Sequence, residues 1–342
     1  MAKDKISIPH IAFEITNECN LKCLYCYNHW KRNDSEFVIL NSYKKAQKVL
    51  KQLFRIAHVK NVAFTGGEPF LGERIAELVL YCRMKGASIT IISNGNAGTQ
   101  EDYKQLIDLG VNLFEFPLHA RNPQIHDSMT GVKGSWEHSY NSIAKVQEMG
   151  AYVVPVIVLT KFNYLQIEDT LLFLRELNLN RIMLNRYNIG GASIAKVATV
   201  LVPNEELKET FRIANEVVGK YGLRVTSNVC TPFCLLNPED YSNIGFGACS
   251  KDPLRKPLTL DIEGNLRVCN HSPVIAGNIF KQPLVDILYS DYTLSWGETT
   301  PEFCEQCAIF DKCMGGCRAA SEQMGFSLKK VDPVLECNNF EL

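Results

Sequence analysis

Short runs of apolar and β-branched residues alternate with amphipathic stretches of helical period over the first two thirds of the chain. The apolar runs predict strands at residues 11–15, 62–65, 88–93, 113–118, 153–159 and 182–185. The amphipathic stretches predict helices at residues 42–57, 75–85, 102–109, 139–149, 167–177 and 205–221. A strand followed by a helix, repeated in this way, favours an α/β fold with a parallel sheet and right-handed crossovers. Six such units are too few for an eight-fold barrel, so a partial barrel and an open doubly wound sheet both fit.

Chemically capable residues follow the first three predicted strands. Cys19, Cys23 and Cys26 come after the first strand, Gly-Gly-Glu-Pro at 66–69 after the second, and Ser-Asn-Gly at 93–95 after the third. In parallel α/β folds the chemistry lies at the carboxyl ends of the strands. We therefore expect all three segments to lie together at the carboxyl ends of the strands.

The alternation stops after about Arg224, and the remaining tail is rich in loops and cysteines. One hairpin is predicted there, with strands at 258–261 and 266–269 around a Glu-Gly-Asn turn at 263–265. Small cysteine-rich regions usually need a staple in place of a core. We therefore expect a core domain at 1–228 and a separate tail domain at 229–342.

Composition narrows the class of protein. The 342 residues carry a net charge of −1, which gives no electrostatic support for binding nucleic acid. No apolar run reaches the roughly 20 residues of a membrane span, and the N-terminus lacks the apolar stretch of a signal peptide. We expect a cytoplasmic protein without membrane or nucleic-acid partners. In that reducing compartment the thirteen cysteines favour metal binding or redox chemistry over disulfides.

The first three cysteines have the Cx3Cx2C spacing that suits one iron–sulfur cluster. Three thiolates leave the fourth iron of a cubane open for a substrate or cofactor. The simpler alternatives are a zinc knuckle or a chance grouping. Structural zinc usually takes four protein ligands, and only His29 is nearby as a fourth.

The segment 19–27, Cys-Asn-Leu-Lys-Cys-Leu-Tyr-Cys-Tyr, resembles the signature of the radical S-adenosylmethionine (SAM) superfamily. The resemblance implies a partial (β/α)6 TIM barrel, a SAM-binding [4Fe–4S] cluster on Cys19, Cys23 and Cys26, and reductive cleavage of SAM to a 5′-deoxyadenosyl radical. It implies that Tyr25 lies against the adenine. It also implies a flavodoxin or ferredoxin as electron donor.

The segment 66–69 matches the second motif of this superfamily. Gly66 and Gly67 can let the backbone approach a ligand closely, and Glu68 can accept charge-assisted hydrogen bonds from an ammonium group. Ser93 and Asn94 resemble positions that contact the ribose and the methionine of SAM. A polar turn that closes a strand explains these two residues equally well.

The resemblance is weaker after the fourth predicted strand. Related enzymes often read Ser-Leu-Asp-Gly there, whereas this chain reads Pro-Leu-His-Ala at 117–120. His119 is a candidate substrate contact or general base, or else a histidine at a strand end. His126 and Asp127, in the loop that follows, are expected to be structural.

The tail resembles the SPASM extension, which carries auxiliary clusters in radical SAM oxidoreductases that modify peptides and related substrates. The matching positions are Cys249, Gly264-x4-Cys269, Cys304-x2-Cys307-x5-Cys313-x3-Cys317 and Cys337. The resemblance implies one auxiliary cluster on Cys304, Cys307, Cys313 and Cys337, and another on Cys249, Cys269 and Cys317. Two structural zinc sites are the alternative.

The second of these clusters lacks a fourth ligand, because some relatives have a further cysteine where this chain has Arg255. Either one iron is open or the ligand comes from elsewhere. Cys230 and Cys234 lie just before the array. Each is a candidate for the missing ligand, for a hydrogen donor to a substrate radical, or for a buried apolar residue. We take Cys234 as the candidate donor, and we expect Cys82 to lie in the core.

An auxiliary cluster that accepts the electron of a substrate radical makes the net reaction an oxidation, such as a crosslink, a desaturation or a decarboxylation. We expect a ribosomally made peptide as substrate. The alternatives are a tetrapyrrole or sugar substrate, epimerisation of a peptide with a cysteine donor, and a non-enzymatic metal-binding protein. The first strand is predicted within about ten residues of Met1. A peptide is therefore expected to need a separate leader-recognition protein or direct capture.

Overall fold

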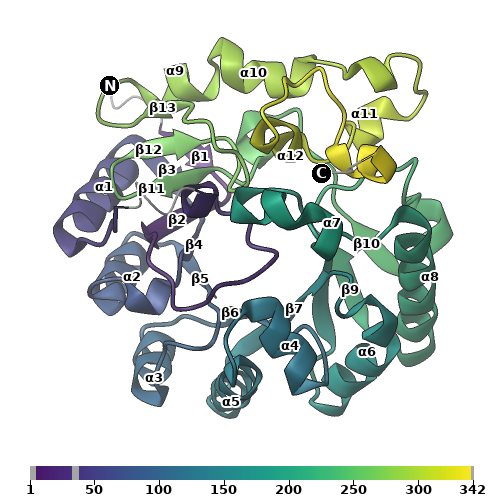
Figure 1. The fold of residues 1–342 in the computed structure, drawn as a ribbon. Coiled ribbons are helices and arrows are strands. Elements are labelled where there is room, and N and C mark those ends of the chain that lie inside the picture. The colour runs from purple at the N-terminus through teal and green to yellow at the C-terminus, as the bar shows by residue number, and fades with distance from the viewer. Residues whose placement is uncertain (1–4, 33–37, 340–342) are drawn as a thin grey trace.

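The computed structural model describes residues 5–32 and 38–339, and most of its strands belong to one curved sheet (Figure 1). Eight parallel strands lie in the order β10-β9-β8-β7-β6-β5-β4-β2. Their bounds are β2 Ile11–Thr16, β4 Asn61–Gly66, β5 Ser88–Ile92, β6 Leu113–Pro117, β7 Tyr152–Leu159, β8 Arg181–Arg186, β9 Arg224–Ser227 and β10 Ile244–Phe246. The six predicted strands and the partial barrel are confirmed.

The helices form a ring outside these strands (Figure 1). The six predicted helices are α1 Tyr43–Ile56, α2 Ile75–Met84, α3 Gln100–Asp108, α5 Ser135–Glu148, α6 Ile167–Glu176 and α8 Asn204–Tyr221. Two further short helices, α4 Pro123–Thr130 and α7 Val197–Val200, lie in the connections. In α1 the buried positions Ala46, Val49, Leu50 and Leu53 recur at helical spacing, so one apolar stripe faces the sheet.

The strands supply much of the core, and β2 is covered on both faces. Every residue of β2 is buried, and Phe13 on this strand meets Phe64 on β4 edge to face, with ring centroids 5.8 Å apart. Each such fully buried side chain contributes about 1.5–3 kcal/mol to folding. The rigid sheet that results fixes where the loops at its carboxyl edge begin.

The tail continues the same sheet. Strand β11 (Thr259–Asp261) pairs with β2 in parallel, and β12 (Asn265–Arg267) and β13 (Gly277–Asn278) follow in antiparallel order. The predicted hairpin is therefore confirmed. Strands from both sides of the expected boundary at residue 228 share one sheet, because β10 and β11 extend its two edges.

The remaining elements are short. Strands β1 (Ile6–Ile8) and β3 (Ala57–Val59) form a small parallel pair. The tail adds the helices α9 Leu284–Leu288, α10 Asp291–Glu298, α11 Phe310–Cys313 and α12 Arg318–Gln323, which lie along one side of the ring in Figure 1. Within the described ranges, no helix is long and apolar enough to span a membrane.

Candidate functional site

The loop that carries the first three cysteines leaves β2 and runs inside the helix ring (Figure 1). Its backbone is fixed by α4: the N–H of Lys22 donates to the carbonyl of Thr130 at 3.0 Å, and the N–H of Leu24 donates to that of Met129 at 2.8 Å. Hydrogen-bonded neighbours on both sides of Cys23 hold this loop in one conformation.

The three thiols of this loop lie close enough to affect one another. Burial, together with negative charge at Cys26 and Cys19, raises the pKa of Cys23 to about 12. Burial acts to lower the pKa of Lys31, but negative charge at Cys26, Cys19 and Cys23 outweighs it and raises that pKa. A cation beside three neighbouring thiols would stabilise their thiolate forms, which are the ligands of an iron–sulfur cluster, so these residues fit the predicted cluster.

The two glycines after β4 lie against this loop. A Cβ at Gly66, where φ is +130°, would lie 2.1 Å from the carbonyl oxygen of Thr16, and one at Gly67 would lie 1.9 Å from that of Glu18. The N–H of Gly67 donates to Thr16 O at 2.8 Å, and the N–H of Glu68 donates to Glu18 O at 2.7 Å. The close approach that requires glycine is thus to the cysteine loop, in addition to any approach to a ligand.

Glu68 joins the ends of β4 and β5. It is fully buried, its Oε1 accepts from Ser93 Oγ at 2.8 Å, and its Oε2 accepts from the N–H of Asn94 at 2.7 Å. The Asn94 amide in turn lies 3.8 Å from Cys19 Sγ. The structure therefore brings Glu68, Ser93 and Asn94 together beside the cysteine loop, as predicted, and contact of Glu68 with the ammonium of SAM stays a prediction.

Tyr25, which is partly buried, forms a pair with the buried side chain of His119. The Tyr25 hydroxyl lies 2.6 Å from His119 Nε2, and the rings meet edge to face at 4.7 Å. The N–H of Val158 donates to His119 Nδ1 at 3.2 Å, so the hydrogen of the neutral ring is on Nε2 and points to Tyr25. Burial holds the pKa of His119 well below its usual range. His119 is therefore a neutral hydrogen-bond donor here.

His126 and Asp127 have structural surroundings. His126 Nδ1 accepts from the N–H of His119 at 3.2 Å. Asp127 accepts from the N–H groups of Gly134 at 2.6 Å and Trp136 at 2.8 Å, at the start of α5. These contacts account for the expected structural role of both residues.

Four thiols of the tail line one cavity of about 80 Å³: those of Cys230, Cys249, Cys269 and Cys317. N–H groups lie near three of their four sulfur atoms. The Asn188 amide lies 3.3 Å from Cys317 Sγ, the N–H of His271 lies 3.4 Å from Cys269 Sγ, and Lys256 Nζ lies 3.9 Å from Cys249 Sγ. Hydrogen bonds to sulfur stabilise thiolates and tune clusters bound to them, so this cavity fits a cluster.

A second group of thiols lies around Cys313. The N–H of Phe233 donates to Cys313 Sγ at 3.2 Å, and negative charge at Cys313 and Cys307 adds to burial in raising the pKa of Cys304 to about 11. Cys234 lies near Cys313 and belongs to the same group. Burial raises the pKa of Cys234, and negative charge at Cys313 adds to this effect. The side chain of Cys337, which the SPASM resemblance assigns to this group, lies outside the described residues.

Across the described ranges, no three Cys, His, Asp or Glu side chains converge at the distances that a single metal ion requires. An iron–sulfur cluster requires a different arrangement, because each thiolate binds its own iron and the ligands surround the volume of the cluster. Thiols placed around a cavity have this arrangement. Cys82, by contrast, is fully buried in α2 among apolar residues, as expected.

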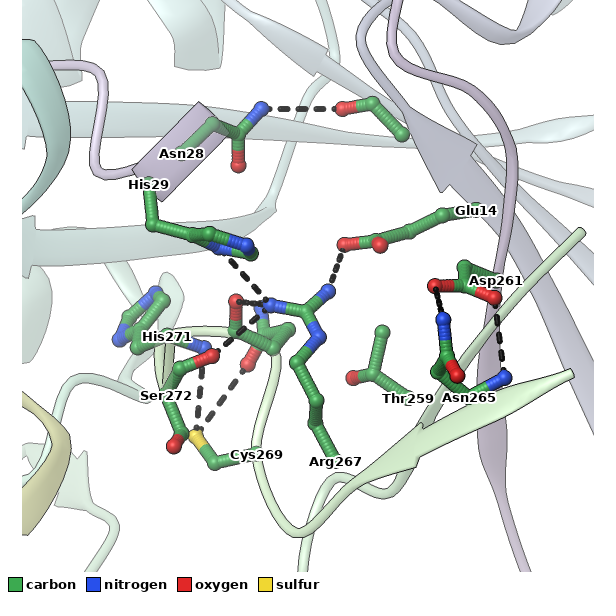
Figure 2. A network of polar contacts seen from close by, with 12 residues as sticks. Glu14, Asn28, His29, Thr259, Asp261, Asn265, Arg267, Cys269, His271 and Ser272 are labelled. Atoms are coloured by element: carbon green, nitrogen blue, oxygen red, sulfur yellow. Dashed lines mark hydrogen bonds and ion pairs between the residues drawn. The ribbon is translucent and has the colours of Figure 1, made fainter. Parts of the chain in front are cut away.

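Arg267 joins the barrel to the tail close to Cys269 (Figure 2). On β12, its guanidinium forms a buried ion pair with Glu14 of β2 and donates to the carbonyl of Ser272 at 2.9 Å. It also lies 3.3 Å from His29 Nδ1. Burial and the charge of Arg267 lower the pKa of His29 to about 4, so His29 is neutral.

A cavity of about 110 Å³ adjoins this ion pair and is also lined by Trp30 and Asp261. Sequence reasoning did not identify Glu14 or Arg267 as part of the site. The sequence showed only that each predicted strand contains one of these charged residues. The hydrophobic pattern of a strand cannot show which distant residue such a charge will pair with.

Comparison with known proteins gives a consistent result. The sequence profile of the Radical SAM superfamily matches residues 13–174. The antilisterial bacteriocin subtilosin biosynthesis protein AlbA of Bacillus subtilis (strain 168) is 24% identical over 322 residues, which are 90% of this chain and 66% of AlbA. The PqqA peptide cyclase of Xanthomonas axonopodis pv. citri is 22% identical over 338 residues, 95% of this chain and 87% of the cyclase.

Among solved structures, native anSMEcpe with bound AdoMet and Kp18Cys peptide has the same fold, with a TM-score of 0.73 at 15% sequence identity. The match covers 96% of this chain and 94% of anSMEcpe. The profile match begins at the third residue of β2 and ends in α6, so it includes the cysteine loop and the segments after β4 and β5. This chain therefore carries a radical SAM domain at residues 13–174.

Proposed function

We propose that this chain is a radical SAM oxidoreductase of SPASM type that oxidatively modifies a ribosomally made peptide. The observation that carries the proposal is the grouping of the thiols: three in the radical SAM loop, and two further groups in a tail that shares the barrel's sheet. The peptide is supported by the names of two similar proteins, the PqqA peptide cyclase and the anSMEcpe complex with a peptide.

In this proposal Cys19, Cys23 and Cys26 hold the SAM-binding cluster. With SAM and one electron from a flavodoxin or ferredoxin, that cluster would supply a 5′-deoxyadenosyl radical able to take a hydrogen atom from the substrate, and the auxiliary clusters would supply an acceptor for the electron that the substrate loses together with a proton. The auxiliary ligands are Cys304, Cys307, Cys313 and Cys337 in one group, and Cys249, Cys269 and Cys317 in the other.

The residues around the first loop would bind and position SAM. Tyr25 would contact the adenine, and Gly66, Gly67, Glu68, Ser93 and Asn94 would line the rest of the site. The hydrogen bond from His119 fixes the Tyr25 ring in one orientation. A neutral, buried His119 adds no charge to this site.

Cys234 remains the candidate hydrogen donor if the product is an epimer. Its side chain is exposed, whereas Cys230 is partly buried. A donor must reach the substrate radical, and exposure makes that possible for Cys234. An epimerase would return a hydrogen atom to the substrate, so its product would have the mass of the starting peptide.

The test is turnover of short peptides encoded beside the gene, by anaerobically reconstituted protein with SAM and dithionite. We expect 5′-deoxyadenosine and a peptide that has lost two hydrogen atoms, both measured by mass spectrometry. The Cys19→Ala/Cys23→Ala/Cys26→Ala variant is expected to form neither product while keeping part of its iron chromophore. Formation of 5′-deoxyadenosine without any change in a peptide would contradict the peptide substrate. Deuterium uptake without mass loss would replace oxidation by epimerisation.

A further inference from the structure

We infer that Cys230 is the fourth protein ligand of the auxiliary cluster held by Cys249, Cys269 and Cys317. This inference rests on the proposed function, since it takes the tail to bind clusters. It replaces the open iron that the sequence left as one alternative with a fully ligated site.

The first observation is the cavity itself. Cys230 follows β9, Cys249 follows β10, Cys269 follows β12, and Cys317 precedes α12, yet all four line the same cavity of about 80 Å³. A single water needs only about 10–15 Å³ of such space, so the cavity is several times larger than a water site. Four thiols from four separate segments around one such volume are what a cubane requires.

The second observation is the rigidity of the Cys230 backbone. The guanidinium of Arg186, at the end of β8, donates to the carbonyl of Cys230 at 2.9 Å and to Thr231 Oγ1 at 3.0 Å. Arg186 also pairs with Asp332, and the same Asp332 oxygen accepts from the N–H of Cys317 at 2.7 Å. A buried ion pair therefore connects the backbones of Cys230 and Cys317 and fixes their separation.

The third observation concerns Arg255, which occupies the position where some relatives have a further cysteine. Arg255 is exposed on the outside of a short turn and does not line the cavity. Its neighbour Lys256 turns inward, is 3% exposed and donates to the carbonyl of Ser250 at 2.5 Å. The local position thus supplies a cation to the cavity, and the fourth thiol comes from Cys230 on the barrel side.

The charges of the cavity agree with four thiolates. Lys256 and Arg318 line it and are both buried, and Arg186 is buried behind Cys230. Buried cations are costly without anionic partners. Asp332 pairs with Arg186, whereas thiolates at Cys249 and its neighbours would supply anionic partners for Lys256 and Arg318.

Full ligation has a functional consequence. A cubane with four protein thiolates has no free iron for a thiolate or carboxylate of the substrate. The cavity would then serve electron transfer alone, and the substrate would react at the SAM site without binding this cluster.

The test uses Cys230→Ala in the Cys19→Ala/Cys23→Ala/Cys26→Ala background, which isolates the auxiliary clusters, and reads out EPR spectra after mild oxidation. We expect the background protein to keep about eight irons and to show little [3Fe–4S] signal. Adding Cys230→Ala leaves one iron without a protein ligand, so that iron is lost on oxidation and a [3Fe–4S] signal appears. The matched control is Cys82→Ala, which removes a buried thiol distant from the cavity and is expected to give the background spectrum.

Two outcomes contradict different statements. A background protein without iron would overturn the auxiliary clusters themselves, and with them the proposed function. A background protein that keeps its iron and gives the same EPR spectrum with and without Cys230 would overturn only the ligand assignment.

Alkylation of the wild-type protein tests the assignment without a substitution. Cys230 is expected to resist iodoacetamide in the reconstituted protein and to react after iron is removed by a chelator. Equal reactivity in both states would overturn the inference.

Discussion

Glu68 shows how one buried residue organises the candidate SAM site. Its carboxylate contacts the end of β5 through Ser93 and Asn94, and the N–H of Phe70 also donates to it at 3.1 Å. Burial outweighs these hydrogen bonds and raises the pKa of Glu68 to about 7 from 4.5. A carboxyl group with a raised pKa binds a proton in the folded protein at a pH where the unfolded chain has already released it.

The free energy of unfolding is therefore expected to fall as pH rises from about 4.5 to about 7, by on the order of 3 kcal/mol from this group. Glu68→Gln removes the titration, so the difference between wild type and variant should change by that amount across the window. Chemical denaturation of the metal-free protein at both ends of the window measures it. Val79→Ala, which removes a buried apolar group, should give a difference that does not depend on pH.

At the scale of elements, the ends of β4 and β5 form one unit with the cysteine loop. Gly67 lies so near the backbone of that loop that no side chain fits between them. The geometry of the loop therefore depends on the position of β4 as much as on its own sequence.

Gly67→Ala is expected to displace the backbone at Glu18, because the new Cβ would lie 1.9 Å from its carbonyl oxygen. We expect loss of about four of roughly twelve irons, and SAM cleavage reduced about a hundredfold. Iron analysis and 5′-deoxyadenosine formation measure these effects. The control is Gly245→Ala on β10, where the new Cβ would make an ordinary 3.4 Å contact with Thr226. Normal iron content in Gly67→Ala would show that the loop tolerates the shift.

Local periodicity explains which elements could be predicted. The six longer strands, β2 and β4–β8, and the six longer helices of the barrel are strongly patterned, and they were found. The first turn of α5 was missed because its N–H groups are capped from a distance by Asp127, which no local pattern shows. Strands β9 and β10 were missed because they have only four and three residues, and β10 contains Gly245.

The same limit applies to the site. The Cx3Cx2C spacing indicated the first thiol group, and the resemblance to the SPASM extension implied the other two. Neither could show that Cys230 lies with Cys249, because their proximity depends on β9 and β10 being neighbours in the sheet. Arg186 and Asp332 were missed for the same reason: a buried ion pair between distant segments leaves no local pattern.

At the scale of the whole molecule, two buried ion pairs join the barrel to the tail. Arg267 of β12 pairs with Glu14 of β2, and Arg186 of β8 pairs with Asp332 near the end of the chain. Both lie beside candidate cluster ligands. Assembly of the auxiliary sites is thereby linked to docking of the tail on the barrel.

Arg267→Ala is expected to lower the free energy of unfolding by about 3–5 kcal/mol, because it leaves Glu14 buried without its partner. The loss should be smaller in acid, where Glu14 becomes neutral. Lys45→Ala is the matched control, since Lys45 and Glu263 also join the barrel to the tail hairpin but are exposed, and it should cost about 0–1 kcal/mol. If urea denaturation gave the same loss of unfolding free energy for both variants, burial of the Arg267–Glu14 pair would not increase its contribution to stability.

The parallel pairing of β11 with β2 also has a consequence for biosynthesis. Ala12 and Thr259 are partners in the sheet, although most of the chain separates them. Strand β2 therefore leaves the ribosome long before β11, and its outer edge stays uncovered until β11 has been made. An uncovered strand edge readily pairs with other chains, and contacts this distant form slowly. We expect nascent or truncated chains that end before β11 to aggregate or to engage chaperones, so the tail would protect the newly made barrel before any cluster is inserted.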